Sequence, residues 1–388
     1  MTILSIETSC DETGIAILER TNTDTVILRG NALASQIDIH AQYGGVFPAL
    51  AKRAHAEKIV PLLQNTLNEA GLLEAKTDES SIPDLSFLDE KESALKAYLI
   101  PFFAAYKKPA IDCIAVTTGP GLEPALWVGI NAARALSIAW DIPVIPINHM
   151  EGHIVAAAIE KKGEHVYLFA DISFPALSLL VSGGHTELVL VEKFGVYKKI
   201  GQTRDDAVGE AFDKVARIIG LPYPGGPAVS KLAQEWRVAT KESHVQNPFS
   251  LPRPMLHSGD FDFSFSGIKT AVLYAARDKD VLSDNDKKAL ACEFETAAIE
   301  VLVKKTLAAA SEYATTTIIV GGGVAANIYL REQLALAAGN TATLLFPESW
   351  LATDNAVMIG LAAATQVISR NKKTRNPNEL RADGNLSL

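Results

Sequence analysis

Residues 2–19, "TILSIETSCDETGIAILE", have the pattern of a strand, a polar turn and a second strand. Both flanks are apolar and rich in β-branched residues, and the turn between them is acidic and hydroxyl-rich. Residues 176–192, "ALSLLVSGGHTELVLVE", repeat this plan with "SGGHT" as the turn. Because each hairpin begins one half of the chain, the repeat predicts two lobes of related design.

Strands and helices alternate through much of the remaining chain. Residues 111–121, "IDCIAVTTGPG", predict a buried strand that enters a Gly/Pro loop, and residues 128–141 predict the helix that follows. Residues 144–160 predict a short strand and a helix, and residues 317–339 a strand, a glycine loop and a helix. This alternation favours an α/β fold with parallel or mixed sheets.

Residues 73–109 do not fit this alternation. Their first part is charged and contains Ser and Pro, and from Lys91 onward the spacing predicts an amphipathic helix. We expect this stretch to be an insertion on the surface of the first lobe.

The composition indicates a large cytoplasmic protein. The chain has 388 residues, 48% of them apolar, which is enough for two sizeable cores. No run of about twenty apolar residues occurs, so we expect no membrane span. The start turns acidic at once, unlike a signal peptide, and three scattered cysteines suit a reducing cytoplasm.

The formal net charge of −9 bears on nucleic-acid binding. Acidic proteins do not bind nucleic acid through bulk charge, so an RNA partner would require a local basic patch or a helper protein. Residues 370–375, with their arginines and lysines, are one candidate patch. The alternative for this tail is a solvated, frayed terminus.

Two histidines in residues 147–154, "INHMEGHI", are candidate metal ligands. On a helix His149 and His153 share a face, whereas Glu151 leaves it. The order H-x-E-x-H therefore differs from the H-E-x-x-H of zinc proteases. Asp354 is a candidate third ligand, and such a set suits iron(II) or zinc. The alternatives are a histidine pair without metal and a helix N-cap at Thr353 or Asp354.

Two glycine loops follow apolar strands, at 181–186 ("VSGGHT") and 320–327 ("VGGGVAAN"). Glycines let backbone N–H groups approach phosphate closely, although a tight structural turn is the alternative for each loop. Neither loop has the Walker pattern. Together they favour a nucleotide-like ligand between the lobes.

The acidic stretch 205–213 and the single lysine at position 269 are further candidate ligand contacts. Asp213 could accept hydrogen bonds from ribose hydroxyls, or form a surface pair with Arg217 while Asp205 or Asp206 caps the helix. Lys269 could contact phosphate or RNA, or cap a loop.

The first hairpin contains Glu7, Asp11 and Glu12 at its turn, and these carboxylates could orient a metal-bound group or act as general base. Cys10 beside them invites a nucleophile hypothesis. A buried structural thiol is the interpretation we prefer, because no histidine lies near it in the sequence.

These stretches together resemble the bacterial branch of the tRNA threonylcarbamoyladenosine transferases, the TsaD family. The matching segments follow the family order and cover nearly the whole chain; they include "ETSCDETG", "HAQYGGVFPALAKRAH", "TTGPGL", "NHMEGHI", "VSGGHT", "DDAVGEAFDK", "YPGGP", "FSFSGIKTAV", "GGGVAAN" and "TDNAVMIG". The resemblance implies the two-lobed actin-like ATPase fold of sugar kinases and heat-shock chaperones, with a ligand cleft between the lobes. The lobes would be 1–172 plus 351–388, and 173–350.

The resemblance also implies roles for particular residues. His149, His153 and Asp354 would hold one divalent metal ion per subunit, Fe²⁺ in the first place and Zn²⁺ as the alternative. Asp11 and Glu12 would lie at the catalytic cleft. The donor would be bound at its phosphate and threonylcarbamoyl end by Leu180, Val181, Ser182, Gly183 and Gly184, and at its adenylate by Asp213, Gly226 and Asn327.

The implied reaction moves the threonylcarbamoyl group from threonylcarbamoyl-AMP to the exocyclic amine of the adenosine 3′ of the anticodon, in tRNAs that read codons beginning with A. Expected partners are tRNA and two helper proteins, the degenerate paralogue TsaB and the small ATPase TsaE. A kinase or ATPase of the same fold, a non-catalytic scaffold and a metalloprotease are the alternatives. The paired histidines speak against the first, because Mg²⁺ prefers oxygen ligands.

Overall fold

The computed structural model describes residues 1–22, 24–77, 82–241, 245–279, 281–370 and 376–388, with the backbone alone for 367–370. It divides into two compact units. Unit 1 comprises Met1–Asp171 and Thr353–Leu388, and unit 2 comprises Ile172–Ala352. Residues 371–375, most of the basic tail considered above, lie outside the described residues.

Unit 1 is built on a seven-stranded sheet of order β5-β4-β1-β2-β3-β7-β6. The strands are β1 (Thr2–Glu7), β2 (Glu12–Arg20), β3 (Thr25–Ser35), β4 (Cys113–Gly119), β5 (Val144–Asn148), β6 (Ile159–Gly163) and β7 (Val166–Phe169). β1 and β2 form the predicted antiparallel hairpin, and β1 also pairs in parallel with β4, which pairs in parallel with β5. β1 and β4 are buried along almost their whole length, because helices cover both faces of the sheet.

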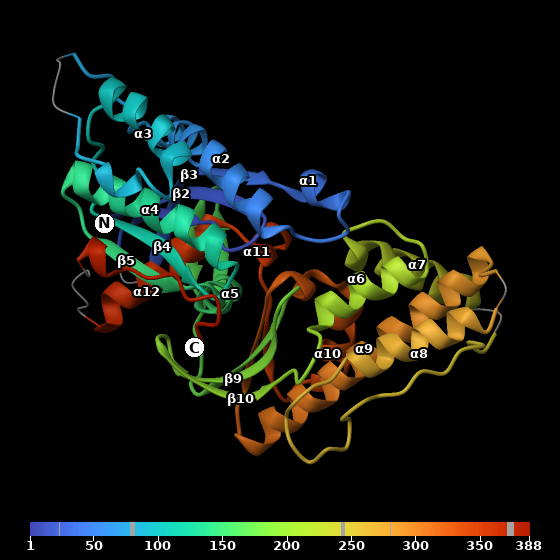
Figure 1. Ribbon diagram of the computed structural model, residues 1–388. Helices are drawn as coiled ribbons and strands as arrows, with labels where there is room; N and C mark the ends of the chain where they lie inside the picture. Colours follow the sequence, from blue (N-terminus) through green and yellow to red (C-terminus); the bar gives the residue numbers. More distant parts are fainter. Residues whose placement is uncertain (23, 78–81, 242–244, 280, 371–375) are drawn as a thin grey trace. The chain divides into compact units, whose positions relative to one another are not determined.

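The helices of unit 1 are α1 (Ile37–Ala41), α2 (Pro48–Glu69), α3 (Ser93–Ala105), α4 (Glu123–Trp140), α5 (His149–Ala157) and α12 (Ala356–Arg370), with short 3-10 turns at Ser86–Leu88 and Pro377–Glu379. Of these helices, α2, α4, α5 and α12 pack on this sheet (Figure 1). The sequence predicted a helix through residue 160, which is wrong at its end. The helix stops at Ala157, because the next residues pair with β7 as strand β6.

Helix α3 comes from the stretch that the sequence marks as an insertion. It starts at Ser93 and lies beside α2 (Figure 1). Leu95, Leu99, Phe102 and Phe103 are at most 3% exposed and belong to the main hydrophobic core of unit 1. This stretch therefore contributes to the core as well as to the surface.

The C-terminal segment, residues 376–388, is fastened to the end of β4 and to the loop that follows it. The backbone N–H of Asp383 donates to the carbonyl of Thr118 at 2.9 Å, and that of Gly121 donates to Gly384 at 3.2 Å. Gly119 allows this approach, since a Cβ on it would lie 1.9 Å from the carbonyl oxygen of Asp383.

Unit 2 repeats the design with a five-stranded sheet of order β10-β9-β8-β11-β12. Its strands are β8 (Ala176–Val181), β9 (Thr186–Lys193), β10 (Val196–Gln202), β11 (Thr317–Gly321) and β12 (Thr343–Leu345). β8 and β9 form the second predicted hairpin, and β8 pairs in parallel with β11 as β1 does with β4. The prediction of an α/β fold with two similar hairpins is confirmed.

The helices of unit 2 are α6 (Val208–Ile218), α7 (Gly225–Thr240), α8 (Ser266–Arg277), α9 (Asp284–Glu312), α10 (Ile328–Ala338) and α11 (Ser349–Ala352), with a 3-10 turn at Gly323–Ala326. Helix α9 supplies many of the side chains of the core of this unit. Within the described ranges, every helix is too short or too polar to cross a membrane.

Candidate functional site

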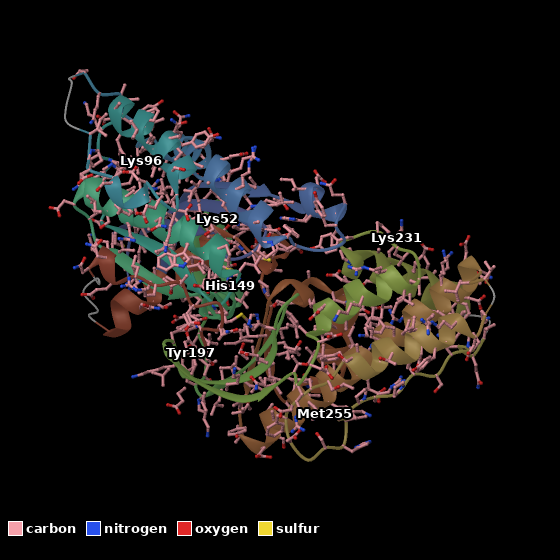
Figure 2. The ribbon with its side chains drawn as sticks, in the orientation of Figure 1. Lys52, Lys96, His149, Tyr197, Lys231 and Met255 are labelled. Atoms are coloured by element: carbon pink, nitrogen blue, oxygen red, sulfur yellow. The ribbon has the colours of Figure 1, made fainter. Side chains whose placement is uncertain are left out.

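The junction between β5 and α5 positions two histidines in unit 1. The side chain of Asn148 accepts a hydrogen bond from the backbone N–H of Met150 at 2.9 Å and so caps the helix. His149 is the first helical residue (Figure 2) and His153 lies one turn further on. Their rings are perpendicular, with centroids 4.8 Å apart. The i, i+4 spacing thus brings both rings to one face, as the sequence predicted.

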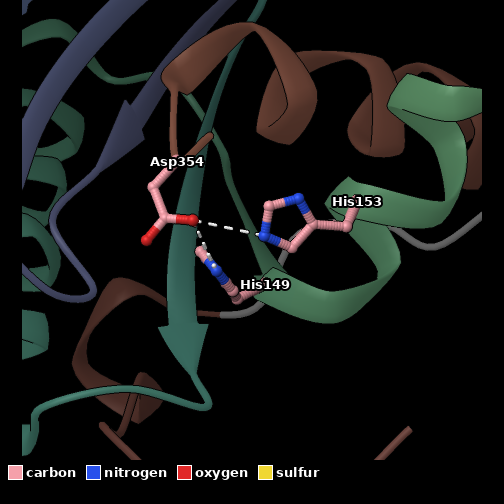
Figure 3. A group of neighbouring side chains, drawn as sticks. All are labelled: His149, His153 and Asp354. Atoms are coloured by element: carbon pink, nitrogen blue, oxygen red, sulfur yellow. Dashed lines mark ion pairs between the residues drawn. The ribbon is translucent and has the colours of Figure 1, made fainter. Parts of the chain in front are cut away.

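Asp354 reaches the same place from the turn between α11 and α12. Its Oδ1 lies 3.3 Å from Nε2 of His149 and 3.2 Å from Nε2 of His153 (Figure 3). The alternative of a cap at Thr353 or Asp354 is not needed, because Asn355 accepts the N–H of Met358 at 2.9 Å. The Asp354 carboxylate is therefore directed to the histidines.

The geometry of these three residues suits a metal ion. Their ligand atoms all lie within 4.8 Å of one another. Ligands about 2.1 Å from a tetrahedral ion are about 3.4 Å apart, close to the distances from Asp354 to each ring. His153 is 1% exposed, and its Nε2 faces only the Asp354 carboxylate among the described residues. A metal bound between Nε2 and that carboxylate would give this buried nitrogen a stronger partner.

Glu151 turns away from this group. Its Oε2 accepts a hydrogen bond from Nε2 of Gln366 at 2.7 Å, on α12. The expectation that Glu151 leaves the histidine face is confirmed, and it is not placed as the base of a zinc protease.

Glu7, at the end of β1, holds the other side of the His149 ring. Its Oε2 lies 3.2 Å from Nδ1 of His149 and accepts from the hydroxyl of Thr117 at 2.5 Å. Its Oε1 accepts from the N–H of Ser9 at 2.5 Å. A metal-binding histidine commonly donates its second N–H to a carboxylate, which fixes the tautomer and the ring. Glu7 is one of the three carboxylates of the first hairpin that the sequence offered for orienting a metal-bound group, but nothing along the chain pointed to His149 as its partner.

These contacts set the charges of the metal-free group. Burial disfavours a charged His149 ring, but Asp354 and Glu7 outweigh it and hold its pKa well above the usual value. Burial likewise opposes the Asp354 carboxylate, and His149 nevertheless lowers its pKa. For His153 burial prevails, and its pKa is lowered.

The turn between β1 and β2 contains Asp11 and Glu12. Asp11 is 8% exposed, and its carbonyl accepts the N–H of Gln36 at 2.9 Å. Burial, together with the charges of Asp354 and Asp11, raises the pKa of Glu12 to about 10. Burial and the same acids also raise the pKa of Cys10, so it is a thiol at neutral pH and not a thiolate nucleophile.

The first glycine loop of unit 2 is a tight turn with open backbone. The N–H of Ser182 donates to the carbonyl of His185 at 2.9 Å. A Cβ on Gly183 or Gly184 would meet no atom within 4 Å, so a ligand could approach both. Leu180 and Val181, by contrast, are fully buried. They lie in β8 and expose neither side chain nor backbone to a donor.

The second glycine loop packs directly on the first. Gly322 has φ 93°, and a Cβ on it would lie 2.4 Å from the carbonyl oxygen of Val181. Gly209, the second residue of α6, approaches the first loop as closely: a Cβ on it would lie 2.6 Å from the carbonyl oxygen of Ser182. The two loops and the start of α6 therefore gather at the end of β8.

Asp213 and Gly226 are brought together by the packing of α6 on α7. Asp213 Oδ1 accepts the N–H of Gly225 at 2.7 Å, and Gly226 faces open space. Asn327 is different, because its side chain donates to Glu295 at 2.7 Å and caps α10 through the N–H of Leu330. Its polar atoms are thus already used within the fold.

The acids before α6 do not cap it. The helix begins without a side-chain cap, so the capping alternative for Asp205 and Asp206 is wrong. Asp205 instead accepts from the backbone N–H of Phe265 at 2.8 Å. Asp206 pairs with Lys214 at 2.8 Å and lies 3.7 Å from Nζ of Lys269.

Comparisons with known proteins agree with this architecture. Full-length HypF, solved in a phosphate- and nucleotide-bound form, superposes over 96% of this chain and 47% of its own, with a TM-score of 0.54 and 11% identity. That likeness supports the actin-like ATPase fold.

Sequence relatives are more specific. The family model of TsaD, tRNA N6-adenosine threonylcarbamoyltransferase, matches residues 27–79 and 103–361. The enzymes of that name from Nitrosospira multiformis and Variovorax paradoxus are each 42% identical over 95% of this chain, and over 92% and 91% of their own. The chain therefore belongs to the family of tRNA N6-adenosine threonylcarbamoyltransferases.

Proposed function

We propose that this chain transfers the threonylcarbamoyl group of threonylcarbamoyl-AMP to N6 of the adenosine 3′ of the anticodon, in tRNAs that read codons beginning with A, and that His149, His153 and Asp354 hold the metal ion needed for this. The carrying observation is the buried group itself, in which both Nε2 atoms lie within 3.3 Å of one carboxylate oxygen. The buried His153 ring that lacks any other partner among the described residues supports it.

Two imidazoles and one carboxylate suit Fe²⁺, our first choice, and also Zn²⁺. When bound, such an ion would supply Lewis acidity toward the threonylcarbamoyl group. The contribution of the chain is orientation: Glu7 would keep His149 with its Nδ1 protonated and its Nε2 free for the ion.

Asp11 is our candidate for the group that accepts the proton of the attacking amine. It lies in the β1–β2 turn next to Glu12, whose raised pKa makes it a poor base at neutral pH. Glu12 could instead donate a hydrogen bond.

The glycine loops of unit 2 are proposed to bind the adenylate part of the donor. Within the 182–184 turn, the open backbone at Gly183 and Gly184 would offset phosphate charge through its N–H groups, whereas the N–H of Ser182 is already used by His185. Asp213 and Gly226 would contact the nucleoside, and Lys269 remains a candidate for phosphate or RNA. Asn327 would act mainly by shaping the loop, because Glu295 and the α10 backbone occupy its side chain.

Helper proteins are part of the proposal. A chain with net charge −9 does not attract tRNA through bulk charge, so partners with basic surfaces would supply part of the phosphate contacts. We propose the degenerate paralogue TsaB and the small ATPase TsaE in this role, in the cytoplasm.

The test is mass spectrometry of tRNA nucleosides after incubation of the chain and its helpers with ATP, threonylcarbamoyl-AMP and unmodified tRNA. A double variant, His149→Ala with His153→Ala, is compared with His257→Ala, which alters an exposed histidine. Bound metal is measured in parallel. We expect threonylcarbamoyladenosine from the parent and from His257→Ala, and neither product nor metal with the double variant. Product from the double variant would refute the metal site, and no product from the parent would refute the donor.

A further inference from the structure

A second pair of buried histidines, His40 and His55, lies in unit 1. Neither has any exposed surface, and the proposed reaction uses neither. His40 belongs to α1 and His55 to α2. Gln36 connects them: its Oε1 is 3.2 Å from Nε2 of His40, and its Nε2 is 3.2 Å from Nδ1 of His55.

The backbone of Phe47 fixes the protons at one end of this connection. Its N–H donates to Nδ1 of His40 at 3.3 Å, so that nitrogen is an acceptor. A neutral His40 ring must then carry its proton on Nε2 and donate to Oε1 of Gln36. This orients the Gln36 amide, whose NH₂ group faces His55.

The backbone of Cys10 fixes the protons at the other end. Its carbonyl lies 3.0 Å from Nε2 of His55 and can only accept, so Nε2 carries the proton. Nδ1 of His55 is then the acceptor, for the hydroxyl of Thr13 at 2.8 Å and for Gln36. Burial lowers the pKa of His55, which agrees with a neutral ring.

The hydrogen bonds therefore run in one direction, from the N–H of Phe47 through His40, Gln36 and His55 to the carbonyl of Cys10. Gln36 is 3% exposed, so its polar groups depend on these partners. A buried polar network in which every member is satisfied specifies one arrangement, whereas an apolar filling would permit several. The backbone N–H of Gln36 also donates to the carbonyl of Asp11 at 2.9 Å. The hydrogen bond from His55 to the Cys10 carbonyl and the one from Gln36 to the Asp11 carbonyl thus both hold the turn that contains Asp11.

We propose that Gln36, His40 and His55 are positioning residues of the transfer reaction, which hold the Cys10–Asp11 backbone where the chemistry requires it. This rests on the proposed function only in taking Asp11 as a reacting group. The hydrogen-bond chain itself can be measured without any activity.

The main variant is Gln36→Met, which keeps the length of the side chain and removes its hydrogen bonds. Since a displacement of about 1 Å can cost about 10²-fold in rate, we expect kcat to fall by at least about tenfold. KM and metal affinity should change by less than about twofold, because the contacts of the metal ligands are unaltered. The matched control is Thr66→Val, which removes a buried α2 hydroxyl that donates to the carbonyls of Leu62 at 2.9 Å and Ile15 at 3.4 Å rather than to Gln36, His40 or His55.

A spectroscopic arm follows the rings directly. Nitrogen NMR of histidine-labelled protein should show His40 and His55 neutral with the proton on Nε2, and Gln36→Met should shift the His55 signals while Thr66→Val does not. If Gln36→Met fails to fold, Thr13→Val and Thr13→Ser replace it, with loss of kcat expected only for the valine.

An unchanged kcat in folded Gln36→Met would overturn the positioning role, even if its melting temperature fell. A proton on Nδ1 of His55 would overturn the hydrogen-bond chain. Absence of product from the parent would refute the proposed function instead, while the spectra would still decide whether the chain exists.

Discussion

Replacing Glu7 by Gln should weaken metal binding without removing a ligand. Glu7 is fully buried and accepts three hydrogen bonds, from His149, Thr117 and the N–H of Ser9. An amide has only one acceptor oxygen. If its NH₂ takes the place of Oε2, it faces the Nδ1–H of His149; if it takes the place of Oε1, it faces the N–H of Ser9. In either orientation two donors meet in a buried site.

The size of the effect follows from these contacts. Loss of the carboxylate partner of a metal-binding histidine typically weakens affinity about 10- to 100-fold, which is about 1.4 to 2.8 kcal/mol. One mismatched buried donor costs about 1–3 kcal/mol by itself, a similar amount. We therefore expect the Kd of Glu7→Gln for Zn²⁺ to rise by between one and two orders of magnitude.

The assay is competition for Zn²⁺ against a chromophoric chelator, at one pH and with folded protein. Glu92→Gln is the matched control, because Glu92 is also a buried carboxylate of unit 1, 4% exposed, but pairs with Lys52 at 2.9 Å. It should lower stability and leave the Kd unchanged. A Glu7→Gln Kd within about twofold of the parent, or an equal rise in both variants, would refute the carboxylate–histidine contact as a determinant of affinity.

Three further predictions concern pH, the C-terminal segment and α3. Burial opposes a charged His149, but its two carboxylate neighbours hold its pKa well above the usual value, so a metal ion must displace a proton from the ring. At pH values below that pKa, the Kd for the metal should therefore fall about tenfold for each unit by which the pH is raised. Calorimetry in buffers of different protonation heat should detect about one proton released per ion bound, and a value of zero would contradict the prediction. Gly119→Ala would place a Cβ 1.9 Å from the carbonyl oxygen of Asp383, so limited proteolysis should cut the C-terminal segment faster, whereas Gly163→Ala, whose Cβ meets nothing closer than 3.7 Å, should not change the rate. Leu99→Ala should lower the free energy of unfolding by about 2–5 kcal/mol in urea titrations and leave the Kd for Zn²⁺ unchanged; a loss below about 1 kcal/mol would mean that α3 packs loosely.

The sequence predicted features that depend on neighbours along the chain. The two hairpins follow from alternating and β-branched residues, and the shared face of His149 and His153 follows from helical periodicity. Pairings between distant segments were harder to predict. Ile159 resembles a continuation of its helix and becomes a strand only because β7 is beside it. Asn327 resembles a ligand contact at the end of a glycine loop, but Glu295, on α9, binds its side chain.

Glu7 and Thr13, on either side of the β1–β2 turn, each contact a buried histidine. Glu7 is the last residue of β1 and bonds to His149, whereas Thr13, near the start of β2, bonds to His55. The turn that contains Asp11 is therefore held at both ends by buried imidazoles, from α5 on one side and α2 on the other. Its position is set by packing that lies outside the turn. A short acidic loop would otherwise be free to move, and the distance from its carboxylates to Asp354 would vary. His55 is neutral, and His149 becomes neutral when a metal ion displaces its proton. The two rings therefore hold the turn without leaving a positive charge beside the bound metal.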